Sequence, residues 1–341
     1  MSQDASLLLG VVIPTHQRAN MLSKVLAALA VQTFPANQFE VIVVMDGSDG
    51  ATELMLRKSS FPFRLCWFTQ PHQGAPAARN LGVASAGADV LVFIDDDIVA
   101  TPGFLQAHYA VHQQESGVVV LGALKPPPDS PGGFVDVAVD WTQGYFDRCS
   151  KPDYQVGGKD LVNPNFSAKK KDVLSAGGWD ETFEGYGGPD DRDLGLRFER
   201  MGMRFRFEVQ ALGYHHQTKG WAGVLRDVRQ NGRTLHHYVE KHPEDLKLVY
   251  WAASNARRRF LFRAIRACPE LVFRALNAFA RLTDRIVGGA RRGRVLESLV
   301  RLSANAVFVR GIWEQPDSAR KLYGLLVAQS RGTVAPGTHI E

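Results

Sequence analysis

The chain has 341 residues, a formal net charge of +5 at pH 7, a hydrophobic fraction of 45% and a charged fraction of 22%. These values are typical of a soluble globular protein with one or two domains. No apolar stretch approaches the roughly 20 residues that cross a bilayer, which excludes a membrane-spanning chain. The three cysteines, Cys66, Cys149 and Cys268, are too widely spaced for a disulfide framework or a metal knuckle. No secretory leader is recognisable, so we expect a reducing, cytoplasmic location.

Strand-like and helix-like segments alternate along the first part of the chain. Short apolar runs predict strands: LLLGVVIP from Leu7, EVIVVMD from Glu40, FRLCWFT from Phe63, DVLVFID from Asp89 and GVVVLG from Gly117. Apolar residues at helical spacing predict helices over about 19–32, with Asn20 as N-cap, and over 52–58, 75–86 and 102–114. This alternation predicts an α/β fold with a mostly parallel sheet covered on both faces.

The rest of the chain is less regular. The segment from about 122 to 190 is rich in Gly and Pro, and we expect long irregular loops of functional importance there. A strand, FRFEVQALGY, follows an acidic helix that begins near residue 190. From about 222 to 330 the pattern is helical, with no strong strand signal.

Polar residues follow three of the predicted strands directly: Pro14–Thr15, Asp46–Gly47 and Asp95–Asp97. Ligands bind beyond the carboxyl ends of the strands in open parallel sheets, so we expect these groups at one edge. Asp46 could accept the N–H of a base or bind a ribose hydroxyl, and the alternative is an ordinary Asp-Gly turn.

Asp95, Asp96 and Asp97 form the densest run of charge. Adjacent carboxylates at a strand end are costly unless a cation neutralises them, and Mg²⁺ or Mn²⁺ takes such oxygen ligands. In an extended chain Asp95 and Asp97 point to the same side, which offers two carboxylates to one ion. The alternative is a polar turn that caps the next helix.

Asp190 and Asp191 open a predicted helix after a loop that contains Gly185, Gly187 and Gly188. Glycines let the backbone approach a ligand closely, and a carboxylate presented from such a loop can act as a general base. The alternative is that both acids only cap the helix, whose N-terminus stabilises anions.

His215 and His216 follow the last predicted strand. A neutral imidazole there can complete the coordination of a metal. Adjacent strand residues point to opposite sides, so at most one of the two is expected to ligate. The alternative is that both are structural.

Five segments, in order, resemble family 2 glycosyltransferases of the GT-A fold: VVIPTHQR, VIVVMDGSDG, GAPAARNLGVASAGADVLVFIDDD, NFSAKKKDVLSAGGWDETF and GYGGPDDRDLGLRF. Each is weak alone, but five at ordinary spacings are specific. The resemblance runs from about Leu8 to about Gln217, and its later segments also resemble the galactosyltransferase-type half of such domains. It implies an α/β, Rossmann-like GT-A domain at 1–221, with nucleotide-binding and acceptor halves divided near 121. It does not cover the rest of the chain, where the helical pattern predicts a helical region at 222–341.

The resemblance implies roles for the donor-binding residues. The Pro14–Thr15 turn would border the nucleotide, with Arg18 nearby. Asp46 would accept the uracil N3–H, and Arg79 would contact the base or the diphosphate. Asp95 would reach the ribose or sugar with Asp96 beside it, and Asp97 would hold the metal. Asp95, His215 and His216 are further candidate metal ligands.

The resemblance also implies roles on the acceptor side. Gly178, Trp179 and Asp180 would shape the sugar and acceptor pocket. Asp191 matches the second position of the family's Glu-Asp pair and would be the catalytic base. This sequence has Asp190 where Glu is usual, which keeps Asp190 as the alternative base.

The sequence therefore predicts a Mn²⁺- or Mg²⁺-dependent, inverting glycosyltransferase. Its donor would be a UDP-sugar, and its acceptor a hydroxyl of a glycan, lipid-linked or small-molecule substrate. One alternative is a sugar-phosphate nucleotidylyltransferase, but PTHQRANM lacks the Gly-rich phosphate loop of those enzymes. Another is a membrane-peripheral scaffold with a decayed domain, against which the intact Asp46, Asp95, Asp97 and Asp191 argue.

The segment 251–310 holds thirteen Arg, no Lys and three acidic residues, a net charge of +10, which leaves −5 for the remainder. Arg alternates there with bulky apolar residues. The segment fits a helical subdomain, or a surface that lies on anionic lipid at the inner face of the membrane. No nucleic-acid partner is expected, because no recognised motif accompanies the charge.

Overall fold

The computed structural model describes residues 7–129, 141–183, 189–216 and 221–242, with a few single positions beyond residue 242. The chain forms two compact units. The first comprises Met1–Ser130, Asp140–Glu184 and Asp190–Thr218, and the second comprises Pro131–Val139, Gly185–Pro189 and Lys219–Glu341. The Arg-rich segment 251–310 lies outside the described residues except for single positions.

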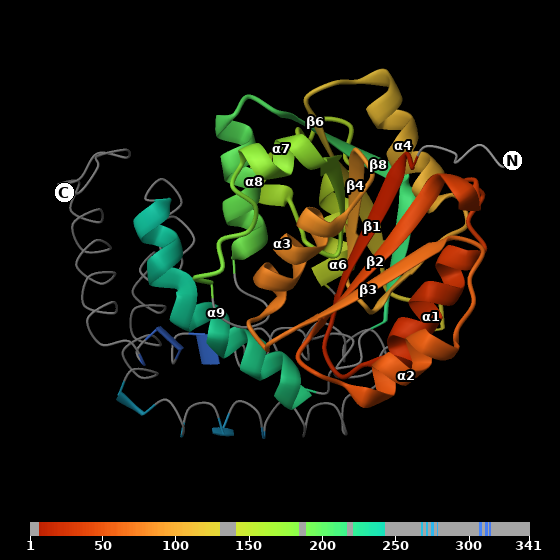
Figure 1. The fold of residues 1–341 in the computed structure, drawn as a ribbon. Helices are drawn as coiled ribbons and strands as arrows, with labels where there is room; N and C mark the ends of the chain where they lie inside the picture. Colours follow the sequence, from red (N-terminus) through yellow and green to blue (C-terminus); the bar gives the residue numbers. More distant parts are fainter. Residues whose placement is uncertain are drawn as a thin grey trace, which may run out of the picture. The chain divides into compact units, whose positions relative to one another are not determined.

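The first unit is built on one sheet of eight strands in the order β3-β2-β1-β4-β7-β6-β8-β5 (Figure 1). Its strands are β1 Leu9–Thr15, β2 Phe39–Asp46, β3 Arg64–Gln70, β4 Val90–Ile94, β5 Ile98–Ala100, β6 Val118–Lys125, β7 Asn165–Lys169 and β8 Arg204–His215. The pairs β3–β2, β2–β1, β1–β4 and β6–β8 are parallel, and the other neighbours are antiparallel. The predicted α/β fold with a mostly parallel sheet is confirmed.

Helices cover both faces of this sheet. They are α1 Ala19–Ala30, α2 Gly50–Lys58, α3 Ala75–Ser85, α4 Phe104–Gln114, α6 Trp141–Cys149, α7 Lys170–Ser175 and α8 Asp190–Arg200, with short 3₁₀ turns at Ala36–Gln38 (η1) and Gly158–Asp160 (η2). All helices predicted in this unit are present, but Asn20 lies inside α1, and the N-cap residue Arg18 makes no side-chain capping bond. The expected Asn20 cap is therefore wrong.

Two apolar cores lie on opposite faces of the sheet. Along β1 the side chains alternate, because successive residues of a strand point to opposite faces: Val11 and Ile13 join one core, and Val12 joins the other. The first core includes side chains from α1 and α4, and the second includes side chains from α3, α7 and α8. All of β1 and β2 is buried, which explains their continuous apolar runs.

The region predicted as irregular contains a strand that the sequence did not reveal. β7 lies antiparallel between β4 and β6. Its apolar residues Phe166 and Ala168 alternate with Asn165 and Ser167, yet all four are buried. The polar pair bonds to histidines of α4 instead of facing water, and this tertiary contact cannot be seen in a pattern of apolar residues.

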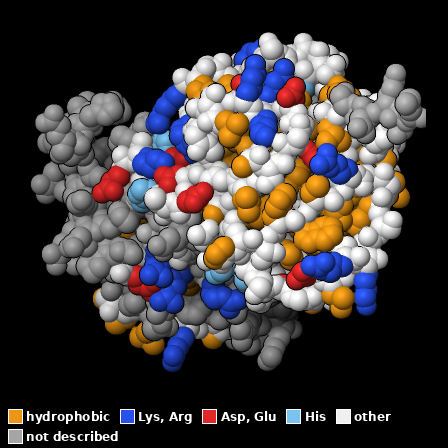
Figure 2. Space-filling model, in the orientation of Figure 1, with side chains coloured by type: hydrophobic (Ala, Val, Ile, Leu, Met, Phe, Trp, Pro, Cys, Tyr) orange, Lys and Arg blue, Asp and Glu red, His pale blue; other side chains and the backbone are white. Residues whose placement is uncertain are grey.

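The sheet ends at β3, whose outer side is only partly covered. Trp67 is half-buried and Phe68 is 37% exposed, while Leu54 of α2 is 52% exposed. Figure 2 shows apolar side chains gathered on this side of the first unit, where β3 is the edge strand.

In the second unit the structure describes the long helix α9, Trp221–Lys241. Arg229 of this helix donates to Glu314 at 2.7 Å through Nε. Across the described part of the chain, no helix is both long enough and apolar enough to span a membrane.

Candidate active site

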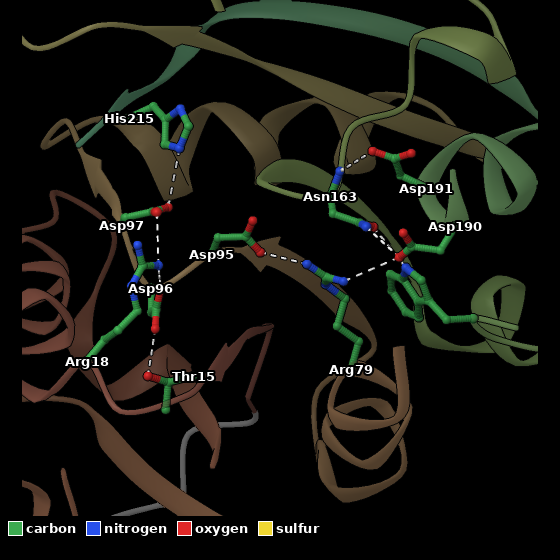
Figure 3. Close-up of polar contacts among 11 residues, drawn as sticks. Thr15, Arg18, Arg79, Asp95, Asp96, Asp97, Asn163, Asp190, Asp191 and His215 are labelled. Atoms are coloured by element: carbon green, nitrogen blue, oxygen red, sulfur yellow. Dashed lines mark hydrogen bonds and ion pairs between the residues drawn. The ribbon is translucent and has the colours of Figure 1, made fainter. Parts of the chain in front are cut away.

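The ends of β1, β2 and β4 meet at one edge of the sheet, as predicted from their parallel order. Thr15, Asp46 and the aspartate run after Ile94 lie there. The aspartates are not extended, because Ile98 N donates to Asp95 O at 3.2 Å and turns the chain before β5. The argument from strand alternation therefore does not apply: Asp95 faces one arginine, while Asp96 and Asp97 face another (Figure 3).

Arg18 holds two of the three aspartates. Its Nη1 lies 2.5 Å from Asp96 Oδ1 and 3.0 Å from Asp97 Oδ2. Thr15 donates its hydroxyl to the other Asp96 oxygen at 2.7 Å. Burial raises the pKa of Asp96 to about 6, although the charge of Arg18 opposes the change. A positive side chain thus stands where the sequence predicted repulsion.

One carboxylate oxygen of Asp97 is not hydrogen-bonded within the described part of the chain. Its Oδ1 is buried and has no hydrogen-bond partner among the described residues, while His215 Nε2 lies 3.6 Å away. Burial raises the pKa of Asp97, but His215 and Arg18 outweigh it and hold that pKa below its usual value. His216 meets Asp97 only through a backbone bond, N to O at 2.8 Å. Of the two predicted histidines, His215 is therefore the one that presents its ring to Asp97.

This pair fits a hard divalent cation. Carboxylate and imidazole ligands lie about 2.0–2.2 Å from such ions, so two atoms 3.6 Å apart can contact the same one. A buried acceptor oxygen without a donor is also costly unless a cation occupies it. Asp97 and His215 are thus the residues present that suit a metal best.

Arg79 of α3 organises the other side of the site. Its guanidinium lies 2.7 Å from Asp95 Oδ1 and 3.5 Å from Asp190 Oδ2, and the residue is 4% exposed. Asn163 donates to the same Asp190 oxygen at 2.8 Å and accepts from Trp179 Nε1 at 2.8 Å. Arg79 therefore joins the aspartate run to the acidic pair of α8, as Figure 3 shows.

The two acids that open α8 occupy different surroundings. Asp190 is buried and Asp191 is half-buried, and Asp191 accepts from the backbone N–H of Arg192 at 2.7 Å. Burial and then the charge of Asp190 raise the pKa of Asp191 to about 7. Gly158 and Gly195 let the η2 backbone pack directly on α8, because a side chain at either position would collide with the other's backbone. This contact places the start of α8 beside Asn163.

The segment Gly178–Asp180 supports the site, because its Trp179 side chain contacts Asn163. The Trp179 N–H donates to Asn80 at 2.8 Å, and its ring packs against Phe93 with 2% exposure. Asp180 accepts from Thr182 N at 2.9 Å. In this structure the indole orients Asn163 and lines no open surface. The loop 184–188 that follows lies outside the described residues, so a role in the sugar and acceptor pocket stays a prediction.

Asp46 is fully buried at the end of β2. Its carboxylate accepts from Gln70 Nε2 at 3.0 Å, Gln73 N at 2.8 Å and Gly74 N at 3.0 Å, and His72 Nδ1 lies 2.9 Å from it. These contacts hold the loop after β3 against β2. Contact between Asp46 and a uracil stays a prediction, and it would require one of these donors to move.

His16, Asp46 and His72 bring one ligand atom each within 4.8 Å of one another. The two imidazole rings lie 4.5 Å apart between centroids. The carboxylate is already engaged by its hydrogen-bond donors, which makes this trio a poorer cation site than Asp97 with His215. Sequence reasoning missed His16 and His72, and it missed Asn163, which lies in a loop without any periodic signal.

Residues 10–150 match the family model described as Glycosyl transferase family 2. The chain therefore carries a family 2 glycosyltransferase domain. The predicted family resemblance is confirmed over this range.

Full-length relatives extend the match. The chain is 30% identical over 277 residues to validoxylamine A glucosyltransferase of Streptomyces hygroscopicus subsp. jinggangensis, an alignment covering 73% of this chain and 64% of that protein. The enzyme of the same name from subsp. limoneus is also 30% identical over 277 residues, covering 73% of this chain and 60% of that protein. The chain thus spans about three fifths of the length of these relatives.

The fold also resembles a solved structure, a mannosyltransferase of Pyrobaculum calidifontis in complex with GDP-Man and Mn²⁺. The TM-score is 0.61 at 16% identity, and the match covers 91% of this chain and 88% of that one. At this identity the likeness speaks for the fold alone, and it confirms the predicted GT-A architecture.

Proposed function

We propose that this protein is a metal-dependent glycosyltransferase that moves a sugar from a UDP-sugar to an acceptor hydroxyl with inversion. The observation that carries the proposal is the arrangement on the two sides of Arg79. On one side lies a buried carboxylate oxygen facing a histidine, and on the other lies a carboxyl group whose pKa is raised to about 7. A nucleotide-sugar transferase needs a cation for the leaving group and a base for the acceptor.

Asp97 and His215 would hold the cation, either Mn²⁺ or Mg²⁺. Such an ion stabilises the negative charge that develops on a diphosphate leaving group. Arg18 already neutralises Asp96 and Asp97 and, at 23% side-chain exposure, can also reach a diphosphate beside them. Thr15 and Arg18 thus position the acidic run for a charged ligand.

Asp191 would act as the base. A group with pKa about 7 is ionised in a large fraction of molecules at neutral pH and still accepts a proton well. The acceptor hydroxyl gives its proton to Asp191, and its oxygen bonds to the anomeric carbon. The bond between the anomeric carbon and the diphosphate oxygen breaks, and its electron pair stays on the nucleoside diphosphate that leaves. Arg79 and Asn163 fix Asp190, which keeps the pair in place.

The donor test is a thermal-shift comparison of UDP and GDP, each with Mn²⁺, with Mg²⁺ and with EDTA. Ligands that bind the native state raise its apparent stability. We expect the largest shift with UDP and Mn²⁺. Preference for GDP, which the Pyrobaculum enzyme binds as GDP-Man, would replace the uridine assignment. No difference between metal and EDTA would contradict the metal-dependent mechanism.

The acceptor is proposed to be a glycan or lipid-linked molecule, reached by an enzyme that lies in the cytoplasm against the inner face of the membrane. The support is the net charge of +10 in the segment 251–310, interleaved with apolar residues. Liposomes with anionic lipid should sediment the protein at low salt and release it at about 1 M salt, where screening shortens to about 3 Å. Equal recovery with neutral liposomes, or none with either, would favour a soluble acceptor.

A further inference from the structure

β8 contains a large bulge just before the candidate active site. From Val118↔Arg204 to Gly122↔Glu208 it pairs with β6 residue by residue, and the next pair is Ala123↔Leu212. The segment 209–211 therefore has no partner on β6, and the register moves by three residues. A bulge bends its strand and re-aims the side chains that follow it.

The position of His215 depends on this bulge. After it, β8 pairs with β5, with Ile98 opposite His215, and β5 begins directly after Asp97. If residues 209–211 paired regularly with β6 instead of bulging, His215 would lie three positions further along β6 and away from Asp97. The distance of 3.6 Å between Asp97 Oδ1 and His215 Nε2 is thus a consequence of the bulge.

Asn165 holds the bulge in place with two hydrogen bonds. This β7 residue is fully buried, and its Nδ2 donates to Ala123 O and to Ala211 O, both at 2.9 Å. Ala123 is the first β6 residue after the register shift, and Ala211 is the last unpaired residue of β8. Asn165 therefore satisfies carbonyl groups on both sides of the irregularity, one from each strand.

A chain of buried hydrogen bonds orients the Asn165 amide. His108 Nε2 lies 2.9 Å from Asn165 Oδ1, His108 Nδ1 lies 2.9 Å from Ser167 Oγ, and His112 Nε2 lies 2.9 Å from the same hydroxyl. The amide oxygen must accept, so His108 carries its hydrogen on Nε2 and accepts from Ser167 on Nδ1. Burial lowers the pKa of His108 to about 3, so the ring stays neutral and keeps both roles.

We propose that Asn165 is a positioning residue for the metal centre. By binding Ala123 and Ala211 it holds the bulge in the one register that brings His215 to Asp97. The proposal rests on the proposed metal role of His215, and it adds a residue that touches neither metal nor substrate.

The test is the Mn²⁺ concentration that gives half of the stabilisation by UDP, or by GDP if the screen above selects it. Asn165→Ala should raise this midpoint about tenfold or more, the usual cost of losing the support of a metal ligand. Nucleotide binding in EDTA should change less than about twofold. His112→Leu is the matched control, because it removes a donor at the far end of the same chain. It should lower the melting temperature and leave the Mn²⁺ midpoint within about twofold.

A double variant separates positioning from general loosening. In a His215→Ala background, Asn165→Ala should have no further effect on the Mn²⁺ midpoint, since interacting residues are not additive. A full tenfold effect without His215, or an unchanged midpoint in Asn165→Ala, would overturn the proposal. An unchanged midpoint in His215→Ala alone would instead overturn the metal role of His215 on which the proposal rests.

Gly122→Ala provides a second route if Asn165→Ala fails to fold. A methyl group on Gly122 would collide with the Asn165 amide, so it displaces the amide without removing it. The Mn²⁺ midpoint should rise as in Asn165→Ala, and a folded Gly122→Ala protein with the wild-type midpoint would count against the proposal.

Discussion

Two arginines at the same sheet edge each bridge two carboxylates, and they do so under different conditions. Arg18 joins Asp96 and Asp97, and its side chain is 23% exposed. Arg79 joins Asp95 and Asp190, and its side chain is only 5% exposed. Each cluster holds one buried polar atom without a hydrogen-bond partner among the described residues, the acceptor Oδ1 of Asp97 in the first and the donor Nε of Arg79 in the second. Asn163 and Trp179 extend the Arg79 cluster through Asp190.

One edge of a sheet can therefore hold acids for two purposes. The partly exposed Arg18, beside an Asp97 oxygen that is not hydrogen-bonded by any described residue, suits a site that binds and releases ligands. A buried counter-ion whose partner Asp190 is also held by Asn163 suits a scaffold that must not move. The same residue types therefore support a cation site on one side and a fixed acidic pair on the other.

The largest expected effect is on stability at the buried cluster. Arg79→Leu leaves the carboxylates of Asp95 and Asp190 uncompensated, and it should lower the free energy of unfolding by about 3–5 kcal/mol. Arg18→Leu should cost less, because the Arg18 side chain is partly exposed and water can enter the place that it leaves. Urea unfolding measures both.

The control for these two variants is Arg57→Leu, which breaks an exposed pair with Glu53 and should cost less than about 0.5 kcal/mol. If Arg18→Leu costs as much as Arg79→Leu, the contrast between the two clusters is wrong.

The next effect is on chemistry at the acidic pair. Asp191→Asn should reduce transfer about 100-fold or more and leave UDP and Mn²⁺ binding nearly unchanged, because a base acts in the transition state. Asp190→Asn should reduce transfer less. An inactive Asp190→Asn with an active Asp191→Asn would exchange the two roles, and single-turnover assays with a known acceptor distinguish them.

The Arg18 cluster is tested by its response to Mn²⁺. Asp97→Ala should abolish the extra thermal stabilisation that Mn²⁺ gives to UDP-bound protein, a loss of about tenfold or more in metal affinity. The exposed Asp153→Ala is the matched control and should retain the full response. A wild-type response in Asp97→Ala would remove Asp97 from the metal site.

The last test is the pH dependence of stability. The pKa of Asp96 is raised to about 6 and that of Asp191 to about 7, so the native state binds more protons than the unfolded chain above pH about 4. Stability from these groups is present at pH about 4 and is lost as the pH rises to about 7. Asp191→Asn should flatten the upper part of this fall in urea unfolding. An identical slope in wild type and Asp191→Asn would show that the Asp191 pKa is ordinary.

Local sequence patterns were sufficient to predict most strands and helices and several site residues. The buried runs of β1, β2 and β4 and the helical spacing of α1 predicted the alternating fold, since apolar periodicity depends only on near neighbours. The same order placed Thr15, Asp46 and the aspartates at one edge. The extended aspartate run and the Asn20 cap were wrong, because a turn and a helix start depend on contacts outside their own few residues.

The sequence alone determined which chemistry is available: three acids after a buried strand, an acidic pair at a helix start and two histidines after the last strand. Only the tertiary structure decided which of them meet. Arg79 contacts Asp190 across 111 positions of sequence, and Asp97 faces His215 because a bulge shifts β8 by three residues. Such contacts follow from the order and register of strands, which the pairing of distant segments settles and no local periodicity encodes.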